Sequence, residues 1–330
     1  MKLIIQIPCF NEAGSLPETL LALPRQIAGI DTIEYLVIDD GSRDGTSEIA
    51  RQWGVHHIVR HRTNRGLAAA YQSGIDAALA AGADIIVNTD ADNQYDGRDI
   101  PDLVAPILEG RADIVIGDRQ VRTNAHFGRG KQWLQALGSS VVQRLSRTEV
   151  TDAVSGFRAI SRAAAQRIFI TSRFSYTTEM LIQAGGKRMA VVSVPIRTNA
   201  PMRPSRLFRN IPHFILNTGV TMARAWAMYN PLRLFVMAGA LAALAGLAPI
   251  VRFLYFFAVG EGGGHVQSLV LGGVLLMLGV ISIMFGIVAD LIGRNRQLLE
   301  ATLERVRRIE AGLDAERGQA VAPAPLKRSA

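Results

Sequence analysis

The chain has a single cysteine, Cys9, among its 330 residues, so no disulfide can form within one molecule. No base lies at a recognisable spacing from Cys9, which disfavours a catalytic thiol. A lone cysteine beside an apolar run is typical of a small core residue. A chain without disulfides is also typical of a reducing compartment.

Patterns of several other protein classes are missing as well. The segment Gly128–Lys131 lacks the Ser/Thr and glycine spacing of a P-loop, and no GxGxxG opens a helix after the first predicted strand. His56 and His57 are adjacent on a predicted strand and point to opposite faces, so with His61 they do not easily share a metal ion. Met1–Phe10 lacks the regions of a signal peptide. These absences disfavour an ATPase, a hydride-transfer enzyme and a secreted protein.

The formal net charge is +8, but no nucleic-acid recognition motif and no interleaved aromatic residues accompany it. The charge instead suits a surface that faces anionic lipids. We therefore predict a membrane partner and no nucleic acid.

Two long apolar stretches, Leu234–Val259 and Val266–Ala289, lie in the C-terminal third. At about 1.5 Å of rise per residue, a helix over either stretch exceeds the roughly 30 Å hydrocarbon thickness of a bilayer. The connection Gly260–His265 has no lysine or arginine. Arginines lie outside both stretches instead, at Arg203, Arg206, Arg209, Arg224, Arg233, Arg294 and Arg296. This bias predicts an integral inner-membrane protein with two spans and both termini in the cytoplasm.

Arg252 interrupts the first apolar stretch, about two turns from its far end. A charge at this depth is costly unless it reaches an interface or a partner. Two interpretations of Arg252 remain: its side chain extends to the water interface, or it contacts a lipid phosphate.

Before these stretches, short apolar runs alternate with helical patterns. Strands are predicted at Lys2–Ile7, Glu34–Asp39, His57–Arg60, Asp84–Thr89 and Asp113–Ile116. Helices are predicted near Leu16–Ala28, Thr46–Gln52, Leu67–Ala81, Ile100–Leu108 and Gln132–Leu145. This order predicts an α/β domain with a mostly parallel sheet, in which ligands bind at the carboxyl ends of the strands.

Asp90 and Asp92 follow the apolar run of the fourth predicted strand. Side chains spaced i, i+2 on a strand point the same way, so both carboxylates can converge on one divalent cation that clamps a nucleotide diphosphate. The alternative is an ordinary turn, where Asp and Asn are common. The first two strands also end in polar loops, PCFNE and DDGSRDGT, which favours a shared crevice.

The segments PCFNE, VIDDGSRDGT, NRGLAAA, TDADNQ, SGFRAIS and RPSRLF occur in this order over roughly residues 4 to 208. Together they resemble family 2 glycosyltransferases, specifically the polyprenyl-phosphate glycosyltransferases related to dolichol-phosphate mannose synthase. The resemblance implies a nucleotide-binding GT-A fold, a divalent metal (Mg²⁺ or Mn²⁺), a cytoplasmic active site and a lipid-phosphate acceptor.

The resemblance also assigns roles to residues of this chain. The nucleotide-sugar positions are Pro8, Phe10, Glu12, Ile38, Asp40, Asp90, Ala91 and Arg129. The metal positions are Asp90, Asp92 and Gln94, and the acceptor-phosphate positions are Arg158, Arg203, Ser205 and Arg206. Phe10 replaces the usual Tyr, which keeps an aromatic face but loses a hydroxyl. With Asp92, Asp152 is the catalytic candidate, positioning or deprotonating the acceptor; an N-cap or a structural ion pair is its alternative role.

The predicted organisation has five parts. A GT-A domain, 1–205, is followed by an interfacial amphipathic helix, 206–231, a two-helix membrane anchor, 232–293, a cytoplasmic amphipathic helix, 294–317, and a disordered tail, 318–330. Leu299, Val306 and Leu313 recur at seven residues in the fourth part, which allows a homo-oligomer.

The predicted function is inverting transfer of a hexose from a nucleotide diphosphate sugar to undecaprenyl phosphate, with UDP-glucose as the first donor considered and GDP-mannose as the alternative. A processive polysaccharide synthase is disfavoured because the chain lacks a QxxRW motif and further spans. A catalytically inactive membrane scaffold of the same fold is the rival from another class, and the presence of Asp90, Asp92 and Gln94 argues against it.

Overall fold

A computed structural model describes residues 1–120, 143, 148, 150–170, 176–199, 231–260 and 262–320. The chain divides into two compact units, Met1–Thr221 with Leu303–Ala330, and Met222–Thr302. The predicted interfacial helix, 206–231, and the helix near Gln132–Leu145 lie almost entirely outside the described residues.

The first unit contains a seven-stranded sheet in the order β3-β2-β1-β4-β6-β5-β7. Its strands are β1 Lys2–Cys9, β2 Thr32–Asp39, β3 His57–Arg60, β4 Ile85–Asn88, β5 Ile114–Asp118, β6 Arg158–Ser161 and β7 Val191–Pro195. Only β6 runs antiparallel to its neighbours β4 and β5. The predicted mostly parallel α/β sheet is confirmed, and β6 and β7 add two strands to the five expected.

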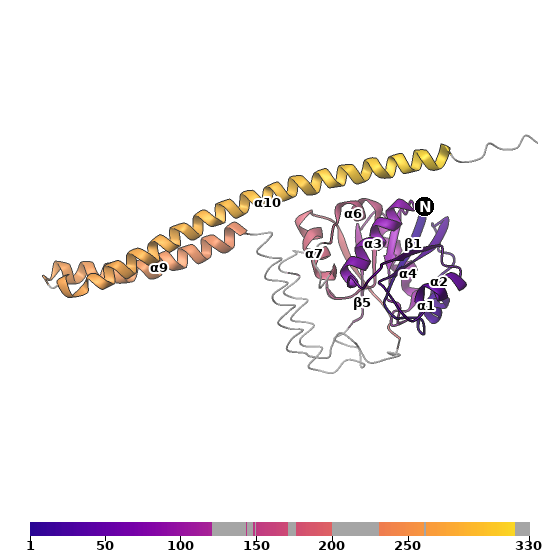
Figure 1. The fold of residues 1–330 in the computed structure, drawn as a ribbon, viewed down its shortest axis with the longest axis horizontal. Coiled ribbons are helices and arrows are strands. Elements are labelled where there is room, and N and C mark those ends of the chain that lie inside the picture. Colours follow the sequence, from indigo (N-terminus) through magenta and orange to yellow (C-terminus); the bar gives the residue numbers. More distant parts are fainter. Residues whose placement is uncertain are drawn as a thin grey trace, which may run out of the picture. The chain divides into compact units, whose positions relative to one another are not determined.

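Helices cover both faces of this sheet (Figure 1). Leu3, Ile5 and Ile7 of β1 share one apolar cluster with residues of α1 (Leu16–Ala22), α2 (Thr46–Gln52) and α4 (Ile100–Leu108). On the other face α3 (Leu67–Ala80) packs on β1 and β2, where Gly74 leaves room for Ile38. Because both faces are buried, β1 is apolar at successive positions instead of alternating.

The remaining elements of this unit are η1 Gly97–Asp99, α6 Arg162–Arg167 and α7 Tyr176–Gly186. Helix α1 ends at Ala22, earlier than the predicted Ala28. Pro24 explains the difference, because the residue before a proline is pushed out of the helical region, and Leu23 is extended with ψ 140°.

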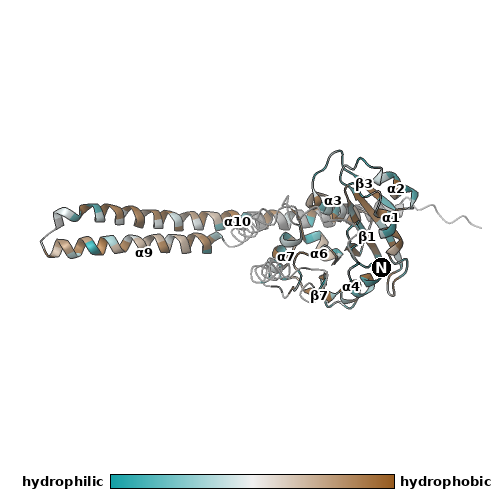
Figure 2. Ribbon diagram, turned by 90° about the horizontal axis from the view of Figure 1, so that it is seen from below, coloured by the Kyte–Doolittle hydropathy of each residue, from teal (hydrophilic) through white to brown (hydrophobic). Residues whose placement is uncertain are grey.

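The second unit is built around a helical hairpin made of α9 (Pro231–Ala258), η2 (Gly262–His265) and the part of α10 (Val266–Ala320) that ends at Thr302. Among the described residues, two segments are long and apolar enough to cross a membrane, Pro231–Ala258 and Gly263–Gly293. Figure 2 shows the hydrophobic colouring of α9 and of the paired part of α10. These segments agree with the two predicted apolar stretches. Helix α10 continues without a break to Ala320, whereas the sequence suggested a separate helix from residue 294.

Glycines bring the two hairpin helices close together. A Cβ added at Gly239 would lie 2.6 Å from the carbonyl oxygen of Gly279, and one at Gly246 would lie 2.8 Å from that of Gly272. Ser282 Oγ also donates to the carbonyl oxygen of Phe235 at 3.1 Å. The helices therefore approach along a stripe where no side chain fits, as is common for helix pairs in membranes.

Candidate functional site

The carboxyl ends of β1, β2 and β4 meet at one edge of the sheet, because β1 lies between the other two. The pairing extends beyond the strands: Asp40 N donates to the carbonyl oxygen of Cys9, and Thr89 N donates to that of Gln6. The three predicted polar loops therefore start side by side. This is the edge at which parallel α/β sheets bind ligands.

Asp90 and Asp92 lie in the turn after β4, and both are partly buried. Burial and the neighbouring charge of Asp92 raise the pKa of Asp90 to about 7, and Glu12 adds to this effect while Arg119 opposes it. A buried carboxylate beside a like charge is stabilised in its ionised form by a cation. Gln94 is fixed in the same turn, where its N–H donates to Oδ1 of Asp92 at 3.1 Å.

Within the described residues, no group of three or more His, Cys, Asp or Glu side chains is arranged to hold a metal ion. The chain thus offers two carboxylates, Asp90 and Asp92, which are the oxygen ligands that Mg²⁺ and Mn²⁺ prefer. Such a donor set fits a cation that takes its remaining ligands from a diphosphate and water, as Mg²⁺ usually does.

A buried polar network holds the strand that leads to Asp90. Asn88 donates to the carbonyl oxygen of Gly156 at 2.8 Å and to the Tyr176 hydroxyl at 3.1 Å. Its own side-chain oxygen accepts a hydrogen bond from Gln6 at 2.9 Å. These residues were not predicted from the sequence to be part of the site, because an Asn inside an apolar strand gives no sign of its partners.

Gly156 closes the space beside Asp90. A Cβ at this position would lie 3.1 Å from Oδ1 of Asp90 and 3.1 Å from the Tyr176 hydroxyl. The backbone N–H of Gly156 donates to the Tyr95 hydroxyl at 3.0 Å. Gly156 is therefore fixed on both sides and allows the carboxylate to approach the backbone.

Asp152 is buried and forms an ion pair with Arg119, which follows β5. The Nε and Nη2 atoms of Arg119 donate to the two oxygens of Asp152 at 2.7 and 2.9 Å. The ion pair considered as an alternative for Asp152 is thus present. Arg119 was not predicted from the sequence, although its place directly after an apolar strand, at the ligand-binding edge, was the available signal.

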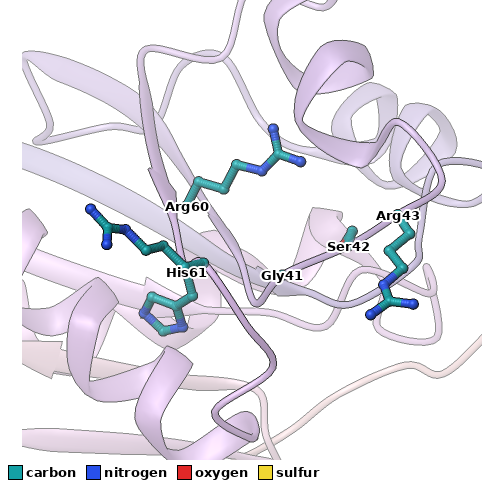
Figure 3. A pocket seen from close by; sticks show the side chains of 6 residues that line it. Gly41, Ser42, Arg43, Arg60 and His61 are labelled. Atoms are coloured by element: carbon teal, nitrogen blue, oxygen red, sulfur yellow. The ribbon is translucent and has the colours of Figure 1, made fainter.

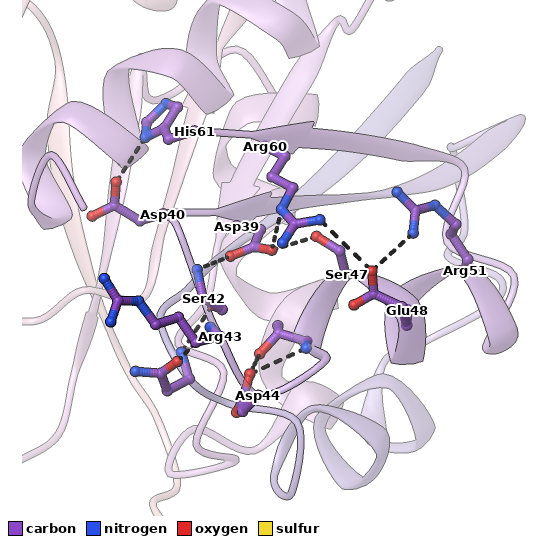
Figure 4. Close-up of polar contacts among 12 residues, drawn as sticks. Asp39, Asp40, Ser42, Arg43, Asp44, Ser47, Glu48, Arg51, Arg60 and His61 are labelled. Carbon is purple, nitrogen blue, oxygen red and sulfur yellow. Dashed lines mark hydrogen bonds and ion pairs between the residues drawn. The ribbon is translucent and has the colours of Figure 1, made fainter. Parts of the chain in front are cut away.

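Asp40, at the end of β2, holds the loop after β3 through hydrogen bonds (Figure 4). Its carboxylate accepts hydrogen bonds from the backbone N–H groups of Arg65 and Gly66, both at 2.8 Å. His61 Nδ1 lies 2.7 Å from Oδ1 of Asp40, and its Nε2 lies 3.0 Å from Ser73 Oγ. Asp40 therefore shapes this side of the crevice through the loop that it holds.

An open hollow of about 470 Å³ lies next to Asp40, between the loop after β2 and the end of β3 (Figure 3). It is lined by Gly41, Ser42, Arg43, Arg60, His61 and Arg62. No acidic residue is among these, so the hollow is basic. Phe10, with 39% of its surface exposed, offers an aromatic face at the end of β1.

The side chains of three predicted nucleotide-sugar residues are not available to a ligand. Pro8 is buried in β1, Ile38 is fully buried and faces α3, and Ala91 belongs to the core cluster with 4% exposure. Any contact from these positions has to come from the backbone. Glu12 is partly buried, and its carboxylate accepts a hydrogen bond from Ser15 Oγ at 2.7 Å.

The prediction that Arg158 binds the acceptor phosphate is not supported. Arg158 is 1% exposed, and its guanidinium donates to the carbonyl oxygens of Ser155, Thr177 and Ala153 at 2.7 to 2.8 Å. It ties β6 to its surroundings from inside the core. The other predicted acceptor-phosphate residues, Arg203, Ser205 and Arg206, lie outside the described residues, as does Arg129, which was predicted to bind the nucleotide sugar.

Comparison with known proteins agrees with this arrangement. Residues 4–169 match the family described as glycosyl transferase family 2. An undecaprenyl-phosphate mannosyltransferase from Micrococcus luteus is 30% identical over 59% of this chain and 83% of its own length. A UDP-N-acetylglucosamine–dolichyl-phosphate N-acetylglucosaminyltransferase from Methanococcus voltae is 27% identical over 58% of this chain and 83% of its own length.

Among solved structures, the fold is similar to that of glucosyl-3-phosphoglycerate synthase from Mycobacterium tuberculosis, crystallised with Mn²⁺, UDP-glucose and phosphoglyceric acid. The TM-score is 0.52 with 21% identity, covering 68% of this chain and 80% of that one. At this identity the likeness concerns the fold alone. The family match covers half of the chain and includes the β1, β2 and β4 loops, and the chain therefore belongs to glycosyl transferase family 2.

Proposed function

We propose that the protein transfers a hexose from a nucleotide diphosphate sugar to a polyprenyl phosphate, with undecaprenyl phosphate as the first acceptor to test. The observation that carries this proposal is the Asp90–Asp92 pair at the ligand-binding edge of the sheet, where burial and the neighbouring charge of Asp92 raise the pKa of Asp90 to about 7. The relatives that act on undecaprenyl and dolichyl phosphates support the acceptor class. UDP-glucose is the first donor to test, and the mannosyltransferase relative favours GDP-mannose as the second.

In this proposal Asp90 and Asp92, with Gln94 beside them, hold Mg²⁺ or Mn²⁺ against the donor's diphosphate. A bound cation supplies charge neutralisation for the leaving nucleotide diphosphate. Phe10 packs against the base, and Asp40 and Glu12 set the walls of the nucleotide pocket. The basic hollow around Arg43 and Arg62 draws the anionic donor to this edge.

On the acceptor side, Asp152 acts as a positioning group. A phosphate monoester is already largely ionised at neutral pH, so the attacking oxygen needs aiming more than deprotonation. The pairing of Asp152 with Arg119 suits this role, because Arg119 occupies both carboxylate oxygens. Attack in line with the departing diphosphate inverts the anomeric carbon. We retain Arg203, Ser205 and Arg206 as proposed contacts of the acceptor phosphate, and Arg129 as a proposed contact of the nucleotide sugar.

The hairpin of α9 and α10 anchors the enzyme in the cytoplasmic membrane in this proposal, with both termini and the active site in the cytoplasm. Its length and hydropathy support two crossings. The distribution of arginines supports the orientation. A homo-oligomer formed through the C-terminal part of α10 remains a prediction.

The experiment that tests the proposal offers the purified full chain a panel of nucleotide sugars with undecaprenyl phosphate and Mg²⁺ or Mn²⁺, and detects glycolipid by mass spectrometry. One donor is expected to yield a hexosyl phosphoryl lipid. Donor hydrolysis without a glycolipid would contradict the acceptor assignment, and the absence of any turnover across the panel would favour the inactive-scaffold alternative.

A further inference from the structure

One charged side chain lies within the apolar hairpin and has no part in the proposed reaction. Arg252 belongs to α9 and is exposed on its surface. In the described part of the hairpin, no carboxylate forms an ion pair with it. An arginine on an apolar, lipid-facing helix is costly unless its guanidinium meets an oppositely charged group or an interface.

The length of α9 places Arg252 near one boundary of the bilayer. Its 28 residues span about 42 Å, against roughly 30 Å of hydrocarbon, so about four residues extend beyond the boundary at each end if the excess is shared. Arg252 then lies within about 5 Å of the boundary at the η2 end, which the long side chain can cover. This is the depth at which lipid phosphates lie.

The aromatic residues of α9 support the same depth independently. The rings of Phe253 and Phe257 are stacked with their centroids 5.9 Å apart, and those of Tyr255 and Phe256 meet edge to face at 5.4 Å. Amphipathic aromatic residues such as Tyr gather at the level of the headgroups. The four rings lie within five residues of Arg252, on its η2 side of the helix.

A second hydrogen-bond donor contacts the same aromatic ring as Arg252 and comes from η2, the connection between α9 and α10. The Arg252 guanidinium carbon is 5.9 Å from the centroid of the Phe256 ring. The same ring stacks on His265 of η2, with a centroid distance of 3.9 Å and an interplanar angle of 27°. Phe256 thus contacts both a guanidinium and an imidazole, and both of these groups can donate to a phosphate.

We propose that Arg252 and His265 form a binding site for the phosphate group of a membrane lipid, in the leaflet at the η2 end of the hairpin. The planar guanidinium binds phosphate through two parallel hydrogen bonds, which ammonium cannot do. An anionic phospholipid such as phosphatidylglycerol and a polyprenyl phosphate both present this chemistry. The inference rests on the membrane placement in the proposed function, but not on the transfer reaction.

The test uses the full chain in a mild detergent, to which defined lipids are added, with bound lipids counted by native mass spectrometry. Phosphatidylglycerol, phosphatidylcholine and undecaprenyl phosphate are titrated separately. The variants are R252Q, which removes the charge, R252K, which keeps the charge without the planar fork, and H265A. The matched control is R305Q, which removes an exposed arginine from α10 outside the apolar segment.

The wild type is expected to bind phosphatidylglycerol more tightly than phosphatidylcholine, and R252Q to bind it about tenfold more weakly, with R252K and H265A between the two. A loss confined to undecaprenyl phosphate would support the phosphate site and assign it to that lipid. Equal binding by R252Q and the wild type, or an equal loss in R305Q, would overturn the proposal. Glycolipid formation by R252Q in saturating lipid is expected to match the wild type, so failure of the transfer assay and failure of lipid binding are separate results.

Discussion

The guanidinium of Arg119 binds the carboxylate of Asp152 through two hydrogen bonds of 2.7 and 2.9 Å, in a part of the crevice where Asp152 is only 2% exposed. Arg119 also lowers the pKa of Asp90, against the larger effects of burial and Asp92. One partly buried cation, the Arg119 guanidinium, therefore connects the acceptor-side carboxylate with the proposed metal pair.

Removing the Arg119 guanidinium is expected to destabilise the protein. The R119M variant leaves the Asp152 charge buried without its partner, and breaking a buried pair in this way costs about 3–5 kcal/mol. The measurement is the free energy of unfolding of the full chain in a mild detergent. In R119M/D152N, which removes both charges, at least half of the loss is expected to return. A loss below about 1 kcal/mol in R119M would show that the pair contributes little.

The raised pKa of Asp90 predicts how the stability of the metal-free protein depends on pH. The folded-state pKa of Asp90 is raised to about 7, whereas an unfolded Asp titrates near 3.9, so between these values the folded chain holds the extra proton. The free energy of unfolding therefore falls as pH rises from about 4 to 7. Because the metal needs the ionised form, Mn²⁺ affinity is expected to rise over the same window.

The D92N variant separates the effect of pH on the stability of the metal-free protein from its effect on Mn²⁺ affinity. It removes the like charge that raises the pKa of Asp90, so the metal-free variant is expected to be more stable than the wild type at pH 7 and to lose most of the stabilisation by Mn²⁺. Thermal unfolding with and without Mn²⁺ at pH 5 and pH 7 measures both. Unchanged stabilisation by Mn²⁺ in D92N would rule out Asp92 as a ligand.

Gly156 offers a test of how closely Asp90 must approach the backbone. The G156A variant adds a Cβ 3.1 Å from the Asp90 carboxylate and 3.1 Å from the Tyr176 hydroxyl, so Asp90 has to move. Overpacking of this kind costs about 1–3 kcal/mol, and we expect kcat to fall at least tenfold. The control is G14A, because nothing lies within 4 Å of a Cβ at Gly14. Wild-type kcat and Mn²⁺ affinity in G156A would argue against a fixed Asp90.

Phe10 is expected to contribute to nucleotide binding by stacking. Loss of a stacking ring costs roughly 1–3 kcal/mol, so F10A should weaken UDP binding about tenfold, whereas F10Y, which keeps the ring, should stay within about threefold of the wild type. Calorimetry with UDP and Mn²⁺ measures the change. W53A is the matched control, since Trp53 is similarly exposed, at 42%, and ends α2. Equal effects of F10A and W53A would contradict a direct contact.

The hairpin is expected to depend on the close approach of its glycines. A Cβ at Gly246 would lie 2.8 Å from the carbonyl oxygen of Gly272, so G246L should separate α9 from α10, while G273L adds a side chain where nothing lies within 4 Å. Cysteines introduced by F235C and G286C report the separation, because a Cβ at Gly286 would lie 2.8 Å from that of Phe235. Disulfide formation should slow in G246L but not in G273L. Equal rates would contradict the packing.

Much of the fold could be predicted because its signals are local. The five apolar runs that end in polar loops predicted β1 to β5, and the two long apolar stretches predicted α9 and the first part of α10. The antiparallel strand β6 was missed because Arg158–Ser161 is short and begins with an arginine. That arginine is buried against carbonyl groups from distant segments, and these partners cannot be read from its own sequence.

The candidate site was predictable only in part for the same reason. Asp90 and Asp92 are visible because they follow an apolar strand at a spacing that suits one cation. Arg119 and Gly156 are not visible, because their importance comes from contacts with residues that lie more than thirty positions away in the chain. The position of Asp152 was predicted by resemblance, but its partner required the structure.

The most direct test of the account is the amount of hexosyl phosphoryl undecaprenol that the purified full chain makes from its preferred nucleotide sugar, compared between the wild type and D92N at matched folding and metal concentration. The account predicts product in the wild type that depends on Mg²⁺ or Mn²⁺, and a loss of at least a hundredfold in D92N. Product formation by D92N at the wild-type rate would contradict it.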